Sequence, residues 1–274
     1  LIGFFAIGGI LFWEQSVRSA NAERQQAALE RMEKITSLSM LFLNARRREK
    51  DFLLRFDPAY VEKHSQVSAK IHTTVDTLMP DLSGQDLDLL KQMTAEYDAY
   101  NAQFKIVVDN WSRMGLDENS GLRGELRSAV HNAEELIHQH ATDDLMVKLL
   151  MMRRHEKDFI IRKDPKYIGR LNDRINEFGK ILETKELDAA IKSDILNTLK
   201  TYKTNFAAFT DLSLGINEQT AIMSDIYAQA EPVLAKLEEN VLASYESEMT
   251  SVAAANRQTV IVTSALILVI AIAC

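Results

Sequence analysis

Two arginine–glutamate pairs have the residue types and the spacing to bind either an acid or each other. Arg46 and Glu49 lie three residues apart, and Arg153 and Glu156 repeat that spacing 107 residues later. At 100° per helical residue, the first pair falls on the same side as the apolar Phe42, so both pairs are expected at a buried seam. A guanidinium group is a planar fork that matches a carboxylate with two parallel hydrogen bonds.

Two interpretations fit this placement. In the first, the charges form a buried network, Arg46 with Glu156 and Arg153 with Glu49, that holds a helical bundle in register. In the second, the arginines receive the carboxylate of a small ligand. Spacing alone favours the network, and both interpretations stay open.

The pairs belong to a sixteen-residue motif that occurs twice, at 46–61 and at 153–168. Ten of the sixteen positions carry the same residue, and no gap is needed. Such a match indicates the internal duplication of one helical unit. Each copy contains Asp-Pro, at Asp57-Pro58 and Asp164-Pro165. The residue before proline avoids the α region and proline suits a first helical turn, so each motif predicts the end of one helix and the start of the next.

The composition favours an all-α protein. Among 274 residues there are only 10 glycines and 4 prolines, too few for the many turns of a β protein. The net charge of −7 argues against nucleic-acid binding, which usually needs a basic domain. The single cysteine, Cys274, excludes an internal disulfide and a multi-cysteine metal site. No cofactor and no metal are expected.

Apolar periodicity predicts a series of long and short helices. Thr184 and Gly215 are the weakest of the breaks, and one of them is expected to be a kink, because two ends on the same side of a membrane need an even number of antiparallel helices. We therefore predict six helices, with one boundary open. Long and short helices together favour two four-helix bundles stacked end to end. The segments before these two breaks are predicted at 14–56, from Asp57-Pro58 to 79, 86–114, 122–163 and from Asp164-Pro165 to about 182.

Both ends of the chain are apolar and uncharged. Residues 1–12 precede Trp13, which fits an interfacial aromatic belt, and the run at 258–274 follows Arg257. Each is shorter than the roughly 20 residues that span a bilayer. We expect the two runs to be truncated transmembrane helices, with a signal-peptide core as the alternative for the first.

The doubled motif resembles a known sensor family. The run Arg-Arg-x-Glu-Lys-Asp-Phe, followed by Asp-Pro-x-Tyr and accompanied by residues 121–131 between the copies, resembles the helical bimodular (HBM) sensor domain of bacterial methyl-accepting chemotaxis receptors and related sensor kinases. The resemblance covers about 14–257. It implies that 13–257 is a periplasmic ligand-binding domain of an inner-membrane protein, in two stacked bundles. It also implies a homodimer and a cytoplasmic signalling module outside this chain.

The resemblance further implies a ligand and the residues that bind it. Such domains bind small organic acids, C4 dicarboxylates such as malate and succinate or acetate, with arginines of the long helices. The matching candidates are Arg46, Arg47, Arg153, Arg154 and Arg31. A second basic cluster, Arg123, Arg127 and His131, has a spacing of four that places it along one helix side, with a solvated face as the alternative.

Other functions have weaker support in the sequence. Glu135 and His138 form one Glu-x-x-His, whereas a di-iron bundle needs two such pairs and two further glutamates. His131, His138 and His140 on one charged helix are more typical of a solvent-exposed face than of a metal site. No phosphate loop or catalytic triad is visible, so the chain is predicted not to be an enzyme. The sensor region of a histidine kinase and a ligand-free helical tether remain as alternatives.

Overall fold

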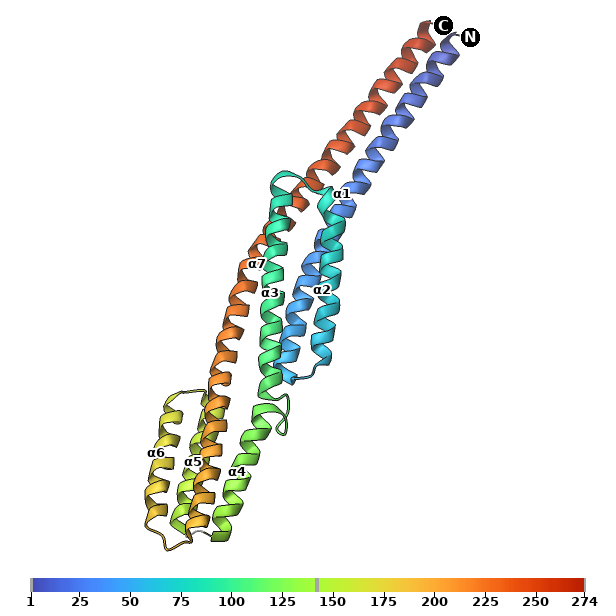
Figure 1. Ribbon diagram of the computed structural model, residues 1–274. Coiled ribbons are helices and arrows are strands. Elements are labelled where there is room, and N and C mark those ends of the chain that lie inside the picture. The colour runs from blue at the N-terminus through green and yellow to red at the C-terminus, as the bar shows by residue number, and fades with distance from the viewer. Residues whose placement is uncertain (1, 141–142, 274) are drawn as a thin grey trace. The chain divides into compact units, whose positions relative to one another are not determined.

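The structure is a computed structural model that describes residues 2–140 and 143–273, and over these residues it is all-α. Seven α-helices and one short 3₁₀ helix follow one another along the chain (Figure 1). They are α1 (Ile2–Arg55), α2 (Ala59–Leu78), η1 (Met79–Asp81), α3 (Gly84–Met114), α4 (Gly121–His140), α5 (Asp143–Arg162), α6 (Lys166–Glu183) and α7 (Ala189–Ala273).

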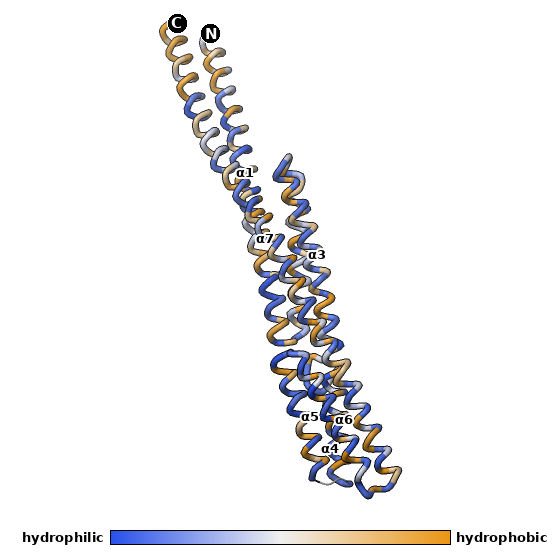
Figure 2. The backbone as a smooth tube through the Cα atoms, turned by 90° about the vertical axis from the view of Figure 1, so that its left-hand side faces the viewer, coloured by the Kyte–Doolittle hydropathy of each residue, from blue (hydrophilic) through white to orange (hydrophobic). Residues whose placement is uncertain are grey.

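The first of two compact units, unit 1, contains the two ends of the chain. It comprises Leu1–Lys50, Glu62–Ala99 and Ile226–Cys274, and hence segments of α1, α2, α3 and α7. The outer parts of α1 and α7 lie side by side (Figures 1 and 2). There the amide of Asn21 donates to that of Asn256 at 2.6 Å. Fully buried side chains of α1, α2, α3 and α7 form the core: Ile35, Leu38, Phe42, Ile71, Leu78, Leu90, Met93, Tyr97 and Leu237.

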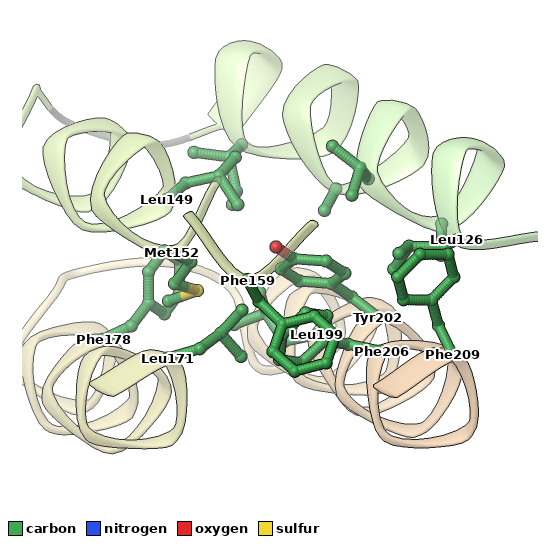
Figure 3. Packing of buried hydrophobic residues seen from close by; sticks show 14 of the residues in the cluster. Leu126, Leu149, Met152, Phe159, Leu171, Phe178, Leu199, Tyr202, Phe206 and Phe209 are labelled. Atoms are coloured by element: carbon green, nitrogen blue, oxygen red, sulfur yellow. The ribbon is translucent and has the colours of Figure 1, made fainter. Parts of the chain in front are cut away.

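Unit 2 holds the second core. It comprises Asp51–Val61 and Tyr100–Asp225, and so includes α4, α5, α6 and the first part of α7. Figure 3 shows the aromatic and aliphatic side chains that fill it, with Phe159 of α5 edge-on to Phe206 of α7 at 5.8 Å between ring centroids. Its labelled members are Leu126, Leu149, Met152, Phe159, Leu171, Phe178, Leu199, Tyr202, Phe206 and Phe209.

The all-α prediction is confirmed, but the predicted number of helices is wrong. The break at Thr184 is real, because α6 ends at Glu183 and α7 begins at Ala189. Gly215 lies inside α7, which also runs through Pro232 without interruption. The extra helix arises elsewhere, because the segment predicted as one helix at 122–163 forms α4 and α5.

An ion pair shows that α4 and α5 fold back on each other. Arg153 of α5 pairs with Glu134 of α4, although 19 residues separate them. In one straight helix these residues would lie about 28 Å apart, at 1.5 Å per residue. Residues 141 and 142, inside the predicted helix, lie outside the described residues. The sequence signal was charge: α5 opens with Asp143 and Asp144, and acidic residues stabilise a helix N-terminus.

Among the described residues, α7 is the one helix with a segment long and apolar enough to cross a membrane, by length and composition. Its C-terminal part is hydrophobic in Figure 2, and large side chains such as Leu268, Val269 and Ile272 are exposed there. The N-terminal part of α1 also exposes Phe4 and Phe12. Residues 1 and 274, at the tips of the two predicted membrane segments, lie outside the described range.

Candidate ligand-binding site

A glycine-dependent turn before α4 places the second basic cluster of the sequence. The turn at 115–120 is so tight that a Cβ atom on Gly115 would lie 1.9 Å from the carbonyl oxygen of Ser120, and one on Gly124 would lie 2.2 Å from that of Asn119. Gly115 also has φ +101°, which side chains rarely adopt. The turn fixes the start of α4, from which Arg123 points over the rings of Phe56 and Trp111.

The two copies of the duplicated motif form the same kind of helix end, and the second copy places the cation Lys163 at the site. Phe56 and Lys163 occupy equivalent positions after α1 and α5, with φ of 54° and 53°. Their backbone N–H groups donate to Phe52 and Phe159 at 2.7 and 2.8 Å. In both copies the aspartate before proline then caps the next helix through its side chain. The positive φ holds Lys163 against the rings of Phe159 and Phe209, at 5.8 and 5.6 Å.

A cavity of about 730 Å³ lies in unit 2 between these features. Volumes of about 300–1,000 Å³ are typical of small-molecule sites. Two of its lining residues, Leu126 and Phe209, face one another from α4 and α7 in Figure 3. The lining comes from the 115–120 turn and from α4, α5 and α7, with Lys163 just after α5: Leu116, Asp117, Glu118, Arg123, Leu126, Arg127, Val130, His131, Arg153, Glu156, Lys157, Ile160, Lys163 and Phe209.

Three of the cations at the cavity already have a carboxylate. Arg153 pairs with Glu134, Arg127 with Glu118 at 3.4 Å, and Lys157 with Glu156 at 3.3 Å. The buried Glu156 also accepts a hydrogen bond from the hydroxyl of Tyr202 at 2.8 Å. Burial and the neighbouring Glu156 raise the pKa of that hydroxyl well above its ordinary value, so it stays a donor.

The other two cations are different. Within 2–140 and 143–273, neither Arg123 nor Lys163 forms an ion pair or a hydrogen bond with a carboxylate. Both side chains are half-buried. Burial lowers the pKa of Arg123, against the opposing charge of Asp117. Burial, followed by the charge of Arg123, lowers the pKa of Lys163. The two groups therefore repel each other across a partly desolvated space, where an anion is stabilised.

The structure brings four of the predicted site residues together and leaves the others elsewhere. Arg123, Arg127, His131 and Arg153 all line the cavity, which joins the two basic regions of the sequence. Arg154 does not line it. Arg154 is exposed on the face of α5 that also exposes the apolar side chains Val147, Leu150 and Ile161.

The remaining predicted residues belong to unit 1. Arg46 pairs with the buried Glu49 of its own helix and lies over the ring of Tyr227, 4.7 Å from its centroid. Arg47 is exposed, and Arg31 is half-buried. Arg46 and Arg153 thus each contact a carboxylate within their own unit.

Comparison with known protein families and with curated proteins finds no match to this chain.

Within the described part of the chain, no group of three or more histidine, cysteine or acidic side chains is placed to hold a metal ion. His131 contacts Glu134 at 3.4 Å instead.

The sequence analysis missed several residues of the site. Lys163 is one of the six positions at which the two motif copies differ, opposite Phe56, and that difference was its only signal. Glu134, the partner of Arg153, could not be placed near it, because the sequence predicted one helix over 122–163. Nor did any signal in the sequence indicate that Tyr202 of α7 contacts Glu156 of α5.

The hydrogen bond between Tyr202 and Glu156 gives the first testable prediction. Tyr202→Phe leaves the buried Glu156 without its strongest neutral donor, so we expect unfolding free energy to fall by about 1–3 kcal/mol. Chemical denaturation of the chain in detergent, followed by circular dichroism, measures it. Adding Glu156→Gln removes the buried charge and should recover part of the loss, whereas additive losses in the double variant would contradict a direct coupling.

Proposed function

We propose that this chain is the extracytoplasmic sensor region of a transmembrane chemoreceptor that binds a small organic acid. The observation that carries the proposal is the cavity of unit 2, a partly open space to which Arg123 and Lys163 present half-buried positive charge. A ligand carboxylate satisfies both charges, because hydrogen bonds between ionised groups are the strong ones. Arg127, His131 and Arg153 lie on the same cavity wall.

The proposal includes two stacked four-helix bundles formed by duplication. The duplicated motif supports it, because both copies share the same helix end and the same aspartate cap. The division into two units also supports it, because unit 1 draws on segments of α1, α2, α3 and α7, and the buried core of unit 2 comes chiefly from α4, α5, α6 and α7. This organisation matches the HBM sensor domains that the sequence resembles.

The membrane part of the proposal rests on the two apolar ends. They lie side by side within unit 1, and next to them α1 and α7 are joined by the Asn21–Asn256 hydrogen bond and by an ion pair between Arg24 and Glu248 at 2.8 Å. Two adjacent apolar helices with polar contacts between them suit a pair of membrane helices that enter from the same side. Residues 13–257 then lie in the periplasm of a bacterial cell, outside the inner membrane.

Signalling follows from the continuity of α7. Phe209 and Tyr202, which contact or flank the cavity, belong to the same helix as the apolar C-terminal segment. A ligand that draws α4 and α5 toward its carboxylate shifts α7 along or across its neighbours. Helix shifts of about 1–2 Å are an established switching mode. A cytoplasmic signalling module and a second copy of the chain complete the receptor, and a histidine kinase could use the same site.

A ligand-free tether is the second candidate, favoured by one observation. Arg46, Arg127 and Arg153 each have a carboxylate partner, as a purely structural network requires. Arg123 and Lys163 distinguish the two functions, because a tether gains nothing from two half-buried cations on one cavity wall.

Calorimetric titration of the 274-residue chain in detergent tests the proposal. The acids are malate, succinate, fumarate, citrate, acetate and benzoate, run beside neutral and amine-bearing controls of similar size. Saturable binding of at least one acid, absent for the controls, is expected. No detectable binding of any of the acids would favour the tether or an unrelated ligand.

The pKa of Lys163 predicts how binding depends on pH. Its pKa lies below the ordinary value of 10.5, so Lys163 loses its proton at a lower pH than an exposed lysine does. Affinity for the acid should therefore decrease at alkaline pH before 10.5 is reached. Lys163→Arg keeps its charge and should retain affinity over that range. Titrations between pH 7 and 10 measure the difference, and equal pH profiles for the two proteins would contradict it.

A further inference from the structure

The cavity of unit 2 has unequal charge along its wall. Five cationic side chains line it, against three carboxylates, Asp117, Glu118 and Glu156. Arg127, Arg153 and Lys157 each have a carboxylate partner, as described above. The positive charge that is free to meet a ligand is therefore confined to Arg123 and Lys163, within the residues that the structure describes.

These two cations line the same cavity and suit a single anionic group. The charge of Arg123 acts on Lys163, and each cation lies over two aromatic rings. The rings shield the two groups from water and restrict their directions. One carboxylate with two oxygens can contact both cations at once.

A second carboxylate on the ligand would find the remaining cations of the wall already paired with carboxylates of the protein. It would compete with Glu118 for Arg127 and with Glu156 for Lys157. At Arg153 it would compete with Glu134. Repulsive groups of this kind exclude competing ligands and so create specificity. The wall accordingly discriminates against dicarboxylates.

Part of the wall is apolar and the cavity is large. Leu126, Val130, Ile160 and Phe209 line it, from α4, α5 and α7. Its volume of about 730 Å³ exceeds several-fold the roughly 150 Å³ of a cavity that holds benzene. A two-carbon acid would leave most of this wall in contact with water, whereas an apolar body of ring size would cover it.

We propose that the ligand is a monocarboxylic acid with an apolar body of about ring size, its carboxylate between Arg123 and Lys163 and its body against Leu126, Val130 and Ile160. The inference rests on the proposed sensor function and names the class of acid. Benzoate and cyclohexanecarboxylate are suitable probes, because they share the carboxylate and differ in aromaticity.

Comparing the affinities of several probes for the 274-residue chain in detergent tests the inference. Titrations use benzoate, cyclohexanecarboxylate, acetate, succinate and the neutral benzamide. Benzoate or cyclohexanecarboxylate should bind at least tenfold more tightly than acetate and succinate, and benzamide should not saturate. Tighter binding of succinate or acetate would overturn the inference and leave the acid sensor in place. Equal binding of benzamide and benzoate would overturn the role of the cations, and no binding of any acid would overturn both proposals.

A matched pair of lysine variants locates the binding site. Lys163→Gln should weaken benzoate binding at least tenfold, whereas Lys180→Gln, exposed on α6 and outside the cavity wall, should leave it unchanged. Circular dichroism checks that both variants remain helical. Unchanged benzoate affinity in a folded Lys163→Gln variant would place the acid elsewhere and overturn the inference.

Discussion

Arg123→Gln is expected to weaken acid binding by about 10- to 100-fold while the chain keeps its helical content. The guanidinium group is half-buried over Phe56 and Trp111 and, among the described residues, forms no ion pair or hydrogen bond with a carboxylate, although the charge of Asp117 acts on it. Its removal therefore costs the ligand a charge-assisted hydrogen bond, worth about 1.5–3 kcal/mol, without exposing a partner in the protein. Calorimetric titration with the tightest-binding acid measures the change.

Arg154→Gln is the matched control for this experiment. The same change is made on α5, at a residue that the sequence suggested for ligand binding and that the structure exposes outside the cavity. Its affinity should stay within about twofold of the unmodified chain, because an exposed charge outside the site is largely screened. The reverse order, with Arg154→Gln the more harmful, would contradict the site in unit 2.

The contrast between Arg153 and Arg154 shows how far the sequence could predict the site. The periodicity correctly separated the faces of the motif, because Glu49 and Glu156 are buried as their seam position required. It could not determine which arginines share a cavity. That depends on α4 and α5 lying antiparallel, an arrangement that no glycine or proline between the two helices signals in the sequence.

The predicted helix ends are correct where the sequence has a strong helix-breaking signal such as Asp-Pro. Asp57-Pro58 and Asp164-Pro165 end α1 and α5 as predicted, since the physics of the residue before proline is local. Gly215 suggested a break but lies inside α7, because a glycine in a helix costs only about 1 kcal/mol and packing of the flanking residues exceeds that. Weak local signals are decided by tertiary contacts, which one sequence does not display.

Gly115→Ala is expected to lower the stability of unit 2 by about 3 kcal/mol or more and to reduce acid binding. At φ +101° an alanine is strained, and its Cβ would lie 1.9 Å from a backbone oxygen that cannot move without opening the turn. Because the turn supplies Leu116 and Asp117 to the cavity and fixes the start of α4, binding should weaken together with stability. Thermal unfolding followed by circular dichroism, and titration with the tightest-binding acid, measure the two effects.

The control is Gly179→Ala, which makes the same change inside α6. A Cβ there meets no atom within 4 Å, so the substitution should raise stability by about 0.5–1 kcal/mol through the lower entropy of the unfolded chain. The opposite signs separate backbone strain in the turn from any general effect of an added methyl group. If Gly115→Ala were as stable as Gly179→Ala and bound the acid normally, the turn would not be what holds Arg123 in the site.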